Sequence, residues 1–198
     1  MIMKRMTAKV LVLFLAAALL CSGLTASADG WEEAFSGVLD SLEAEKPADA
    51  ENPALEYSYL LYDIDKDGIP ELITKTGTCE ADYTGTVYTC KSGEAVKTGE
   101  FGLGHAALYT DPGKNGIIVW WGHMGAAGGV RYSLTDGQIS SEQIFEETLN
   151  IQNDPEAQYT PIEDYVAGTK PLSLYDVSLR LPLDIYAEIL ESLAGVAV

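Results

Sequence analysis

The sequence predicts an α+β fold, an antiparallel β-meander of about six to eight short strands flanked by an N-terminal and a C-terminal helix. Apolar residues recur at helical spacing near both ends of the chain, whereas the middle holds short runs rich in Tyr, Val, Ile and Thr. Gly, Pro, Asp and Asn separate these runs at short intervals. Parallel strands need crossovers of about a dozen residues or more, so the short connections favour antiparallel pairing.

Residues 1–28 have the pattern of a secretory signal peptide. Basic residues precede the apolar run Val10–Leu20, and small residues lead up to a cleavage site between Ala28 and Asp29. The apolar run is shorter than the about 20 residues that span a bilayer, and no later segment is long and uncharged enough to do so. We therefore expect a secreted protein, or one at the extracellular surface, without a transmembrane segment in the mature chain.

A lipid anchor at Cys21 is the alternative to free secretion. The preceding run resembles a bacterial lipoprotein signal, but Leu20 stands where such signals normally have a small residue. Processing at Cys21 is therefore the less favoured prediction.

The segment 31–45 places its apolar residues on one face and its acids on the other, which predicts an amphipathic helix. Residues 46–55 hold two prolines and no periodic pattern, so they form a connector. We expect the helix and linker, 29–55, to form one globular unit with a β-rich region, 56–198, that ends in a helix at Pro182–Ala194.

The β-rich region is divided by turn sequences such as "KSGE", "DPGKNG" and "TDGQ". A further helical turn is expected at Pro161–Ala167. We predict strands at 57–62, 71–76, 85–91, 95–101, 106–110, 117–121, 130–135 and 138–146.

The formal net charge is −18, and loss of residues 1–28 makes it more negative because that segment holds basic residues and no acids. Such a surface repels nucleic acid and anionic lipid. The expected partner is therefore an extracellular protein or a glycan.

Cys79 and Cys90 remain after cleavage of the leader, in a chain bound for an oxidising exterior. A hairpin turning at Thr84-Gly85 would place them opposite each other, within the distance that a disulfide spans. We expect a Cys79–Cys90 disulfide, with two buried free thiols as the alternative.

The stretch "YDIDKDGIPELI" places four carboxylates around one glycine. Asp63, Asp65 and Asp67 occupy alternate positions, Ile69 can offer its backbone carbonyl, and Glu71 follows as a direct or water-mediated ligand. Hard oxygen ligands in this number, without His or Cys among them, suit calcium. The alternative is an ordinary acidic turn.

The loop is not a standard EF-hand, because Thr74 stands where a bidentate glutamate is required and the flanks favour strands. The motif "DIDKDGIPEL" resembles the calcium loop of FG-GAP β-repeats and, over its first six positions, that of dockerins. The resemblance implies a strand-to-strand loop closed around Ca²⁺. The leader, the opening helix and this strand pair also resemble uncharacterised exported proteins of Gram-positive, Clostridia-type bacteria, a resemblance that implies no defined activity.

His105 and His123 flank one predicted hairpin whose turn lies near Lys114, which places them almost opposite each other. Two imidazoles on one face can bind a metal or share acid-base work. Trp120 and Trp121 should point to opposite faces of the same strand, so Trp121 and the two histidines outline a candidate ligand pocket. Structural hydrogen bonding is the simpler interpretation of the histidines, and core packing that of the indoles.

These observations favour a calcium-stabilised, noncatalytic binding or cell-surface module, and no catalytic residues are assigned. An extracellular hydrolase with a site near His105 and His123 is the alternative, and a lipid-anchored accessory protein is a third. A deep pocket that held both histidines and a carboxylate would favour the hydrolase.

Overall fold

The computed structural model describes residues 30–47, 55–150, 152, 154, 157–180, 182, 183 and 186. The predicted signal peptide, Cys21, most of the predicted connector at 46–55 and most of the predicted helix at Pro182–Ala194 lie outside these residues.

One α-helix, one 3₁₀ turn and nine antiparallel strands form the described part of the chain, which confirms the α+β class. The predicted strands are all present, with ends that differ by a few residues. The elements are α2 (Trp31–Glu45), β1 (Glu56–Tyr62), β2 (Glu71–Gly77), β3 (Thr84–Lys91), β4 (Glu94–Gly102), β5 (Ala106–Thr110), β6 (Ile117–His123), β7 (Ala126–Thr135), β8 (Gln138–Thr148), η1 (Ile162–Asp164) and β9 (Tyr175–Asp176).

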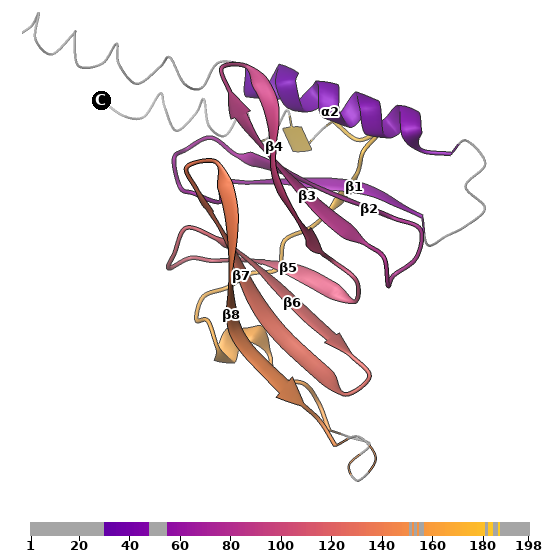
Figure 1. Ribbon diagram of the computed structural model, residues 1–198, viewed down its shortest axis with the longest axis vertical. Helices are drawn as coiled ribbons and strands as arrows, with labels where there is room; N and C mark the ends of the chain where they lie inside the picture. The colour runs from indigo at the N-terminus through magenta and orange to yellow at the C-terminus, as the bar shows by residue number, and fades with distance from the viewer. Residues whose placement is uncertain are drawn as a thin grey trace, which may run out of the picture.

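The strands divide between two sheets. The first has the order β4-β3-β2-β1-β9 and the second the order β5-β6-β7-β8, so each is a meander apart from the returning strand β9. Figure 1 shows α2 lying along the outer side of the first sheet, the second sheet on its other side, and η1 beyond the second sheet. The protein is therefore layered, with the first sheet between the helix and the second sheet.

Three apolar clusters hold these layers together. The first joins the sheets, the second packs α2 and the C-terminal residues onto the first sheet, and the third covers the outer side of the second sheet. Their most buried members are Ile64, Ile73, Val87 and Ile117 in the first, Phe35, Leu39, Tyr59 and Leu72 in the second, and Ile118 and Ile162 in the third.

A polar contact joins the end of β1 to the second sheet. The backbone N–H of Asp111 donates a hydrogen bond of 3.1 Å to the hydroxyl of Tyr62, the last residue of β1. The buried carboxylate of Asp111 in turn accepts from the Arg131 guanidinium, which also donates to Glu142 over 2.6 Å. The loop that follows Tyr62 is thus fixed at the junction of the two sheets.

Candidate metal centre

The acidic segment connects β1 to β2. The two strands pair from Glu56↔Gly77 to Tyr62↔Glu71, so the hairpin closes with Glu71 opposite the last residue of β1. Asp63 follows directly, and Pro70 precedes Glu71. Both ends of the loop are therefore fixed by sheet pairing, as predicted for a strand-to-strand connection.

Ile64 anchors the loop to the protein interior. Its side chain is fully buried in the cluster between the sheets, and its backbone N–H donates a hydrogen bond of 2.8 Å to Oε2 of Glu71. The Glu71 side chain is itself buried, with the residue only 1% exposed. Burial of the Ile64 side chain therefore places its backbone N–H where it holds the Glu71 carboxylate in the interior.

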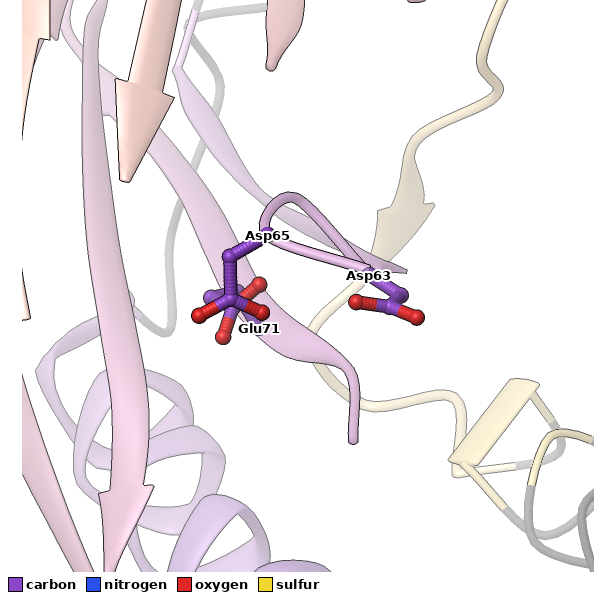
Figure 2. Close-up of side chains that lie close together, drawn as sticks. All are labelled: Asp63, Asp65 and Glu71. Atoms are coloured by element: carbon purple, nitrogen blue, oxygen red, sulfur yellow. The ribbon is translucent and has the colours of Figure 1, made fainter. Parts of the chain in front are cut away.

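Three carboxylates gather at this loop. Asp63, Asp65 and Glu71 each offer one oxygen atom, and these three oxygens lie within 4.8 Å of one another. Figure 2 shows Asp63 and Asp65 on the bend of the loop and Glu71 on the strand that follows it. Three of the four predicted carboxylate ligands are thus brought together from positions that the motif specifies.

The fourth carboxylate has a different partner. Oδ1 of Asp67 accepts a hydrogen bond of 2.8 Å from the backbone N–H of Ile69, two residues on, and Asp67 is not part of the group of three. The Asp67 side chain therefore shapes the turn that carries the Ile69 peptide. Its predicted role as a direct ligand, and that of the Ile69 carbonyl, remain predictions.

Two backbone N–H groups donate hydrogen bonds to the Asp63 carboxylate. Its two oxygens accept from Asp67 N at 3.2 Å and from Gly68 N at 3.1 Å, and Asp65 Oδ1 lies 3.3 Å from the same Asp67 N. The bend needs positive φ values at Lys66 (63°) and Gly68 (93°), a conformation that glycine adopts without a Cβ penalty. The loop thus turns back on its own first carboxylate.

Lys66 does not neutralise the group. Its ammonium donates to the Tyr62 hydroxyl over 2.9 Å and to the backbone carbonyl of Asp63 over 2.5 Å. Among the ion pairs of the described residues, none involves Asp63, Asp65 or Glu71. The charge of the three carboxylates is therefore left for a cation or a proton to balance.

The electrostatics of the group follow from burial and like charge. Burial raises the pKa of Glu71 to about 8, the Ile64 N–H opposes this, and the nearby Asp65, Asp67 and Asp63 charges add to it. The pKa of Asp65 is also raised, chiefly by burial and then by Asp67. Without a cation, Glu71 thus retains its proton at neutral pH.

Tyr186 is the neighbour that sequence reasoning did not assign to this site. Burial and then the charges of Asp63 and Glu71 raise the pKa of its phenol to about 12, against the effect of a hydrogen bond from the backbone N–H of Asp63. Tyr186 also packs edge-on against Trp31 of α2, with ring centroids 6.0 Å apart. The sequence predicts a helix at Pro182–Ala194 that includes Tyr186, but it holds no signal for a contact with residues so distant along the chain.

The predicted Cys79–Cys90 disulfide is wrong in this structure, which leaves both cysteines as free thiols. Cys79 lies in the loop before β3, whereas Cys90 lies near the far end of that strand, opposite Ala95. The rise along β3 separates them by roughly 20 Å, and a disulfide needs Cα atoms within about 7 Å. The exposed Cys79 also departs from the alternative of two buried thiols.

The turn between β2 and β3 lies at residues 78–83, earlier in the chain than the predicted turn at Thr84-Gly85. The Asp82 carboxylate accepts from the backbone N–H groups of Thr78 and Cys79, at 2.7 and 2.9 Å, and closes the loop there. Gly85, the expected turn residue, instead lies inside β3, where the Phe101 ring occupies the space that a Cβ would take. The glycine thus leaves room for the ring inside the strand, and because the connecting loop lies at residues 78–83 the two cysteines do not face each other.

His105 and His123 do lie together, as the hairpin predicted. Their rings stack with centroids 3.8 Å apart and an interplanar angle of 9°, and Nδ1 of His105 lies 3.4 Å from a carboxylate oxygen of Glu80. Trp121 lies on the same strand as His123, but its indole covers Gly128 of the neighbouring strand. The Glu80 side chain is 67% exposed, so the histidines and the carboxylate meet at the surface rather than in a deep pocket.

Comparison of the chain with protein-family models, with curated proteins and with solved structures gave no match. Among the described residues, no helix is long and apolar enough to cross a membrane.

Proposed function

We propose that the β1–β2 loop binds a calcium ion through Asp63, Asp65 and Glu71, and that the protein is an exported, noncatalytic binding or surface module stabilised by this ion. The observation that carries the proposal is the convergence of three carboxylates, one of them buried, with no counter-cation among the described side chains. The acidic-turn alternative does not explain why Glu71 is buried beside two further acids.

The energetics of the group favour a cation. Two carboxylates about 4 Å apart repel by roughly 1 to 4 kcal/mol at effective dielectric constants of 80 to 20. Burial adds a further cost for any charge that has no partner. A divalent ion between the three oxygens replaces these repulsions with attractions, and links both ends of the hairpin loop.

The ligand chemistry favours calcium among the common ions. The three grouped side chains offer only carboxylate oxygens, which suit Ca²⁺ and Mg²⁺ better than zinc or copper. Magnesium requires a near-ideal octahedron, whereas calcium accepts six to eight oxygens in irregular geometry, including backbone carbonyls and water. An asymmetric loop that supplies three carboxylates, with the Ile69 carbonyl and water as further ligands, suits calcium better.

A structural role fits an exported protein. Extracellular calcium modules often have dissociation constants of about 10⁻⁴ to 10⁻³ M, so an ambient calcium concentration about five- to tenfold higher stabilises the fold by about 1 kcal/mol. The surface position of His105, His123 and Glu80 disfavours a hydrolase, whose acid-base groups work best when water is excluded. The proposed partner is an extracellular protein or a glycan.

Calorimetric titration with CaCl₂ and thermal unfolding in calcium or in chelator test the proposal. The wild-type protein should bind one calcium and unfold at a higher temperature in its presence, and Asp65→Asn should lose both effects. Glu33→Gln, which removes one acid from the exposed face of α2, should retain both. Identical unfolding curves in calcium and in chelator would refute the proposal.

A further inference from the structure

The stacked histidines form a second cluster of metal-ligating side chains, far along the chain from the acidic loop. His105 precedes β5 and His123 ends β6, and the backbone N–H of Gly122 donates to the carbonyl of His105 over 3.2 Å. This bond extends the β5–β6 pairing, which begins at Ala106↔Trp121, by one more step. The spacing of the two imidazoles is therefore set by the hairpin backbone.

Glu80 approaches the pair from the loop between β2 and β3. Its carboxylate lies 3.4 Å from Nδ1 of His105, and the backbone carbonyls of Glu80 and Ala81 lie against Gly104, so closely that a Cβ there would meet them at 3.0 and 2.9 Å. A carboxylate beside one imidazole nitrogen favours the tautomer with the proton on that nitrogen. Nε2 of His105 then carries the free lone pair that a metal ion needs.

We propose that His105 and His123 together bind one divalent transition-metal ion of the copper or zinc type, with Glu80 as a positioning residue. Such ions bind imidazole nitrogens at about 2.0 to 2.1 Å, so two ligands of one ion lie within about 4 Å of each other. The ring centroids lie 3.8 Å apart, so a nitrogen of each ring can come within this reach. The stack itself directs the two lone pairs along nearly parallel planes, so binding requires one ring to turn out of the stack, and the exposed His123 has room to do so.

This site differs from the calcium site in chemistry and does not depend on it. Imidazole nitrogens prefer copper, zinc or nickel, whereas the carboxylates of the loop prefer calcium. Among the described residues, the acidic loop is where three metal-ligating side chains come close together. At the histidine site the protein therefore supplies two ligands, the two imidazoles, and water supplies the others. The surface position leaves those coordination sites open to solvent.

Titration with Cu²⁺ in saturating Ca²⁺ tests the pair in a full chain whose cysteines are replaced by serine, because Ca²⁺ competes for the carboxylates of the acidic loop and no thiol remains to bind or reduce copper. We expect one Cu²⁺ per chain and an electron paramagnetic resonance spectrum that shows coupling to two imidazole nitrogens. His105→Phe and His123→Phe each retain a flat ring for the stack, and each should weaken binding at least about tenfold because a chelate needs both ligands. Glu80→Gln should weaken copper binding by about tenfold or more, which is the usual effect of removing a carboxylate that orients a metal-binding histidine.

Two independent surface histidines would behave differently. Each single variant would then halve the number of bound ions and leave their affinity unchanged, and this result would overturn the proposal. Cu²⁺ binding that persists unchanged in the double variant would overturn it as well. Circular dichroism and Ca²⁺ titration of each variant establish that the fold and the acidic loop are intact, so loss of copper binding reports on the pair.

Discussion

The buried carboxylate of Glu71 accepts a hydrogen bond of 2.8 Å from the backbone N–H of Ile64, a residue that is itself fully buried between the two sheets. This bond ties the first turn of the acidic loop to the strand that follows it. It also sets an acid in the interior, where its charge requires compensation.

The stability of the metal-free protein should fall as the pH rises from about 5 to 8. The pKa of Glu71 is raised from 4.5 to about 8 in the fold, so in this range the folded state holds a proton that the unfolded state has released. The free energy of unfolding then decreases with pH, by up to about 1.4 kcal/mol per pH unit. Urea unfolding in chelator at several pH values measures this slope, and a flat profile, identical to that of Glu71→Gln, would contradict it.

Glu71→Gln should stabilise the metal-free protein at pH 8 and abolish the gain from calcium. Glutamine keeps the oxygen that accepts from Ile64 N–H but removes the buried charge, at a site where unpaired charge is costly. We expect a higher melting temperature than wild type in chelator, and no further increase in calcium. A variant that is less stable than wild type in chelator at pH 8 would show that the charge is balanced in some other way.

Asp65→Asn and Asp67→Asn should differ, although both remove one acid from the same loop. Asp65 belongs to the group of three, whereas the Asp67 carboxylate accepts from Ile69 N–H, a bond that an asparagine oxygen can also accept. We expect Asp65→Asn to weaken calcium binding at least about tenfold, and Asp67→Asn to weaken it less. Calorimetry compares the two, and an equal or larger loss for Asp67→Asn would assign Asp67 to the ligands.

Asp111→Asn should destabilise the fold strongly. The Asp111 carboxylate and the Arg131 guanidinium form a buried ion pair, and removal of one partner from such a pair costs up to about 3 to 5 kcal/mol, an upper bound here because Arg131 keeps Glu142 as a partner. The matched control is Glu100→Gln, which breaks the half-exposed pair with Lys97 and should cost less than about 1 kcal/mol. Urea unfolding at pH 7 measures both, and similar losses would contradict the distinction.

Cys79 and Cys90 should both react with a thiol reagent under nonreducing conditions. Cys79 is exposed and should react fast, whereas the partly buried Cys90 should react more slowly. Mass spectrometry of the labelled, digested protein identifies each site. A peptide pair linked through these two residues would restore the disulfide that the sequence predicted.

The strand positions could be predicted from the sequence because the signals are local. Hairpins such as the one at Asp136-Gly137 combine a turn pair with flanking alternation, and both residues take the positive φ values that such turns need. The division into two sheets could not be predicted, because it depends on which faces pack across the inter-sheet cluster. Strand β9 was missed because it consists of Tyr175 and Asp176 alone and depends on pairing with the distant β1.

The candidate site was predicted in its residue types and only partly in its geometry. The alternate acids and the glycine indicated where carboxylates gather, and Asp63, Asp65 and Glu71 do gather there. The sequence could not show that Asp67 bonds to Ile69, because that choice depends on a side-chain rotamer. Nor could it show the approach of Tyr186, which comes from a contact between segments far apart in the chain.

A crystal structure of the protein grown in millimolar CaCl₂ tests directly whether the acidic loop binds calcium. We expect one calcium ion at about 2.3 to 2.6 Å from oxygens of Asp63, Asp65 and Glu71, identified by its anomalous scattering. Well-ordered carboxylates around a site that contains only water, or a calcium ion held by other residues, would contradict it.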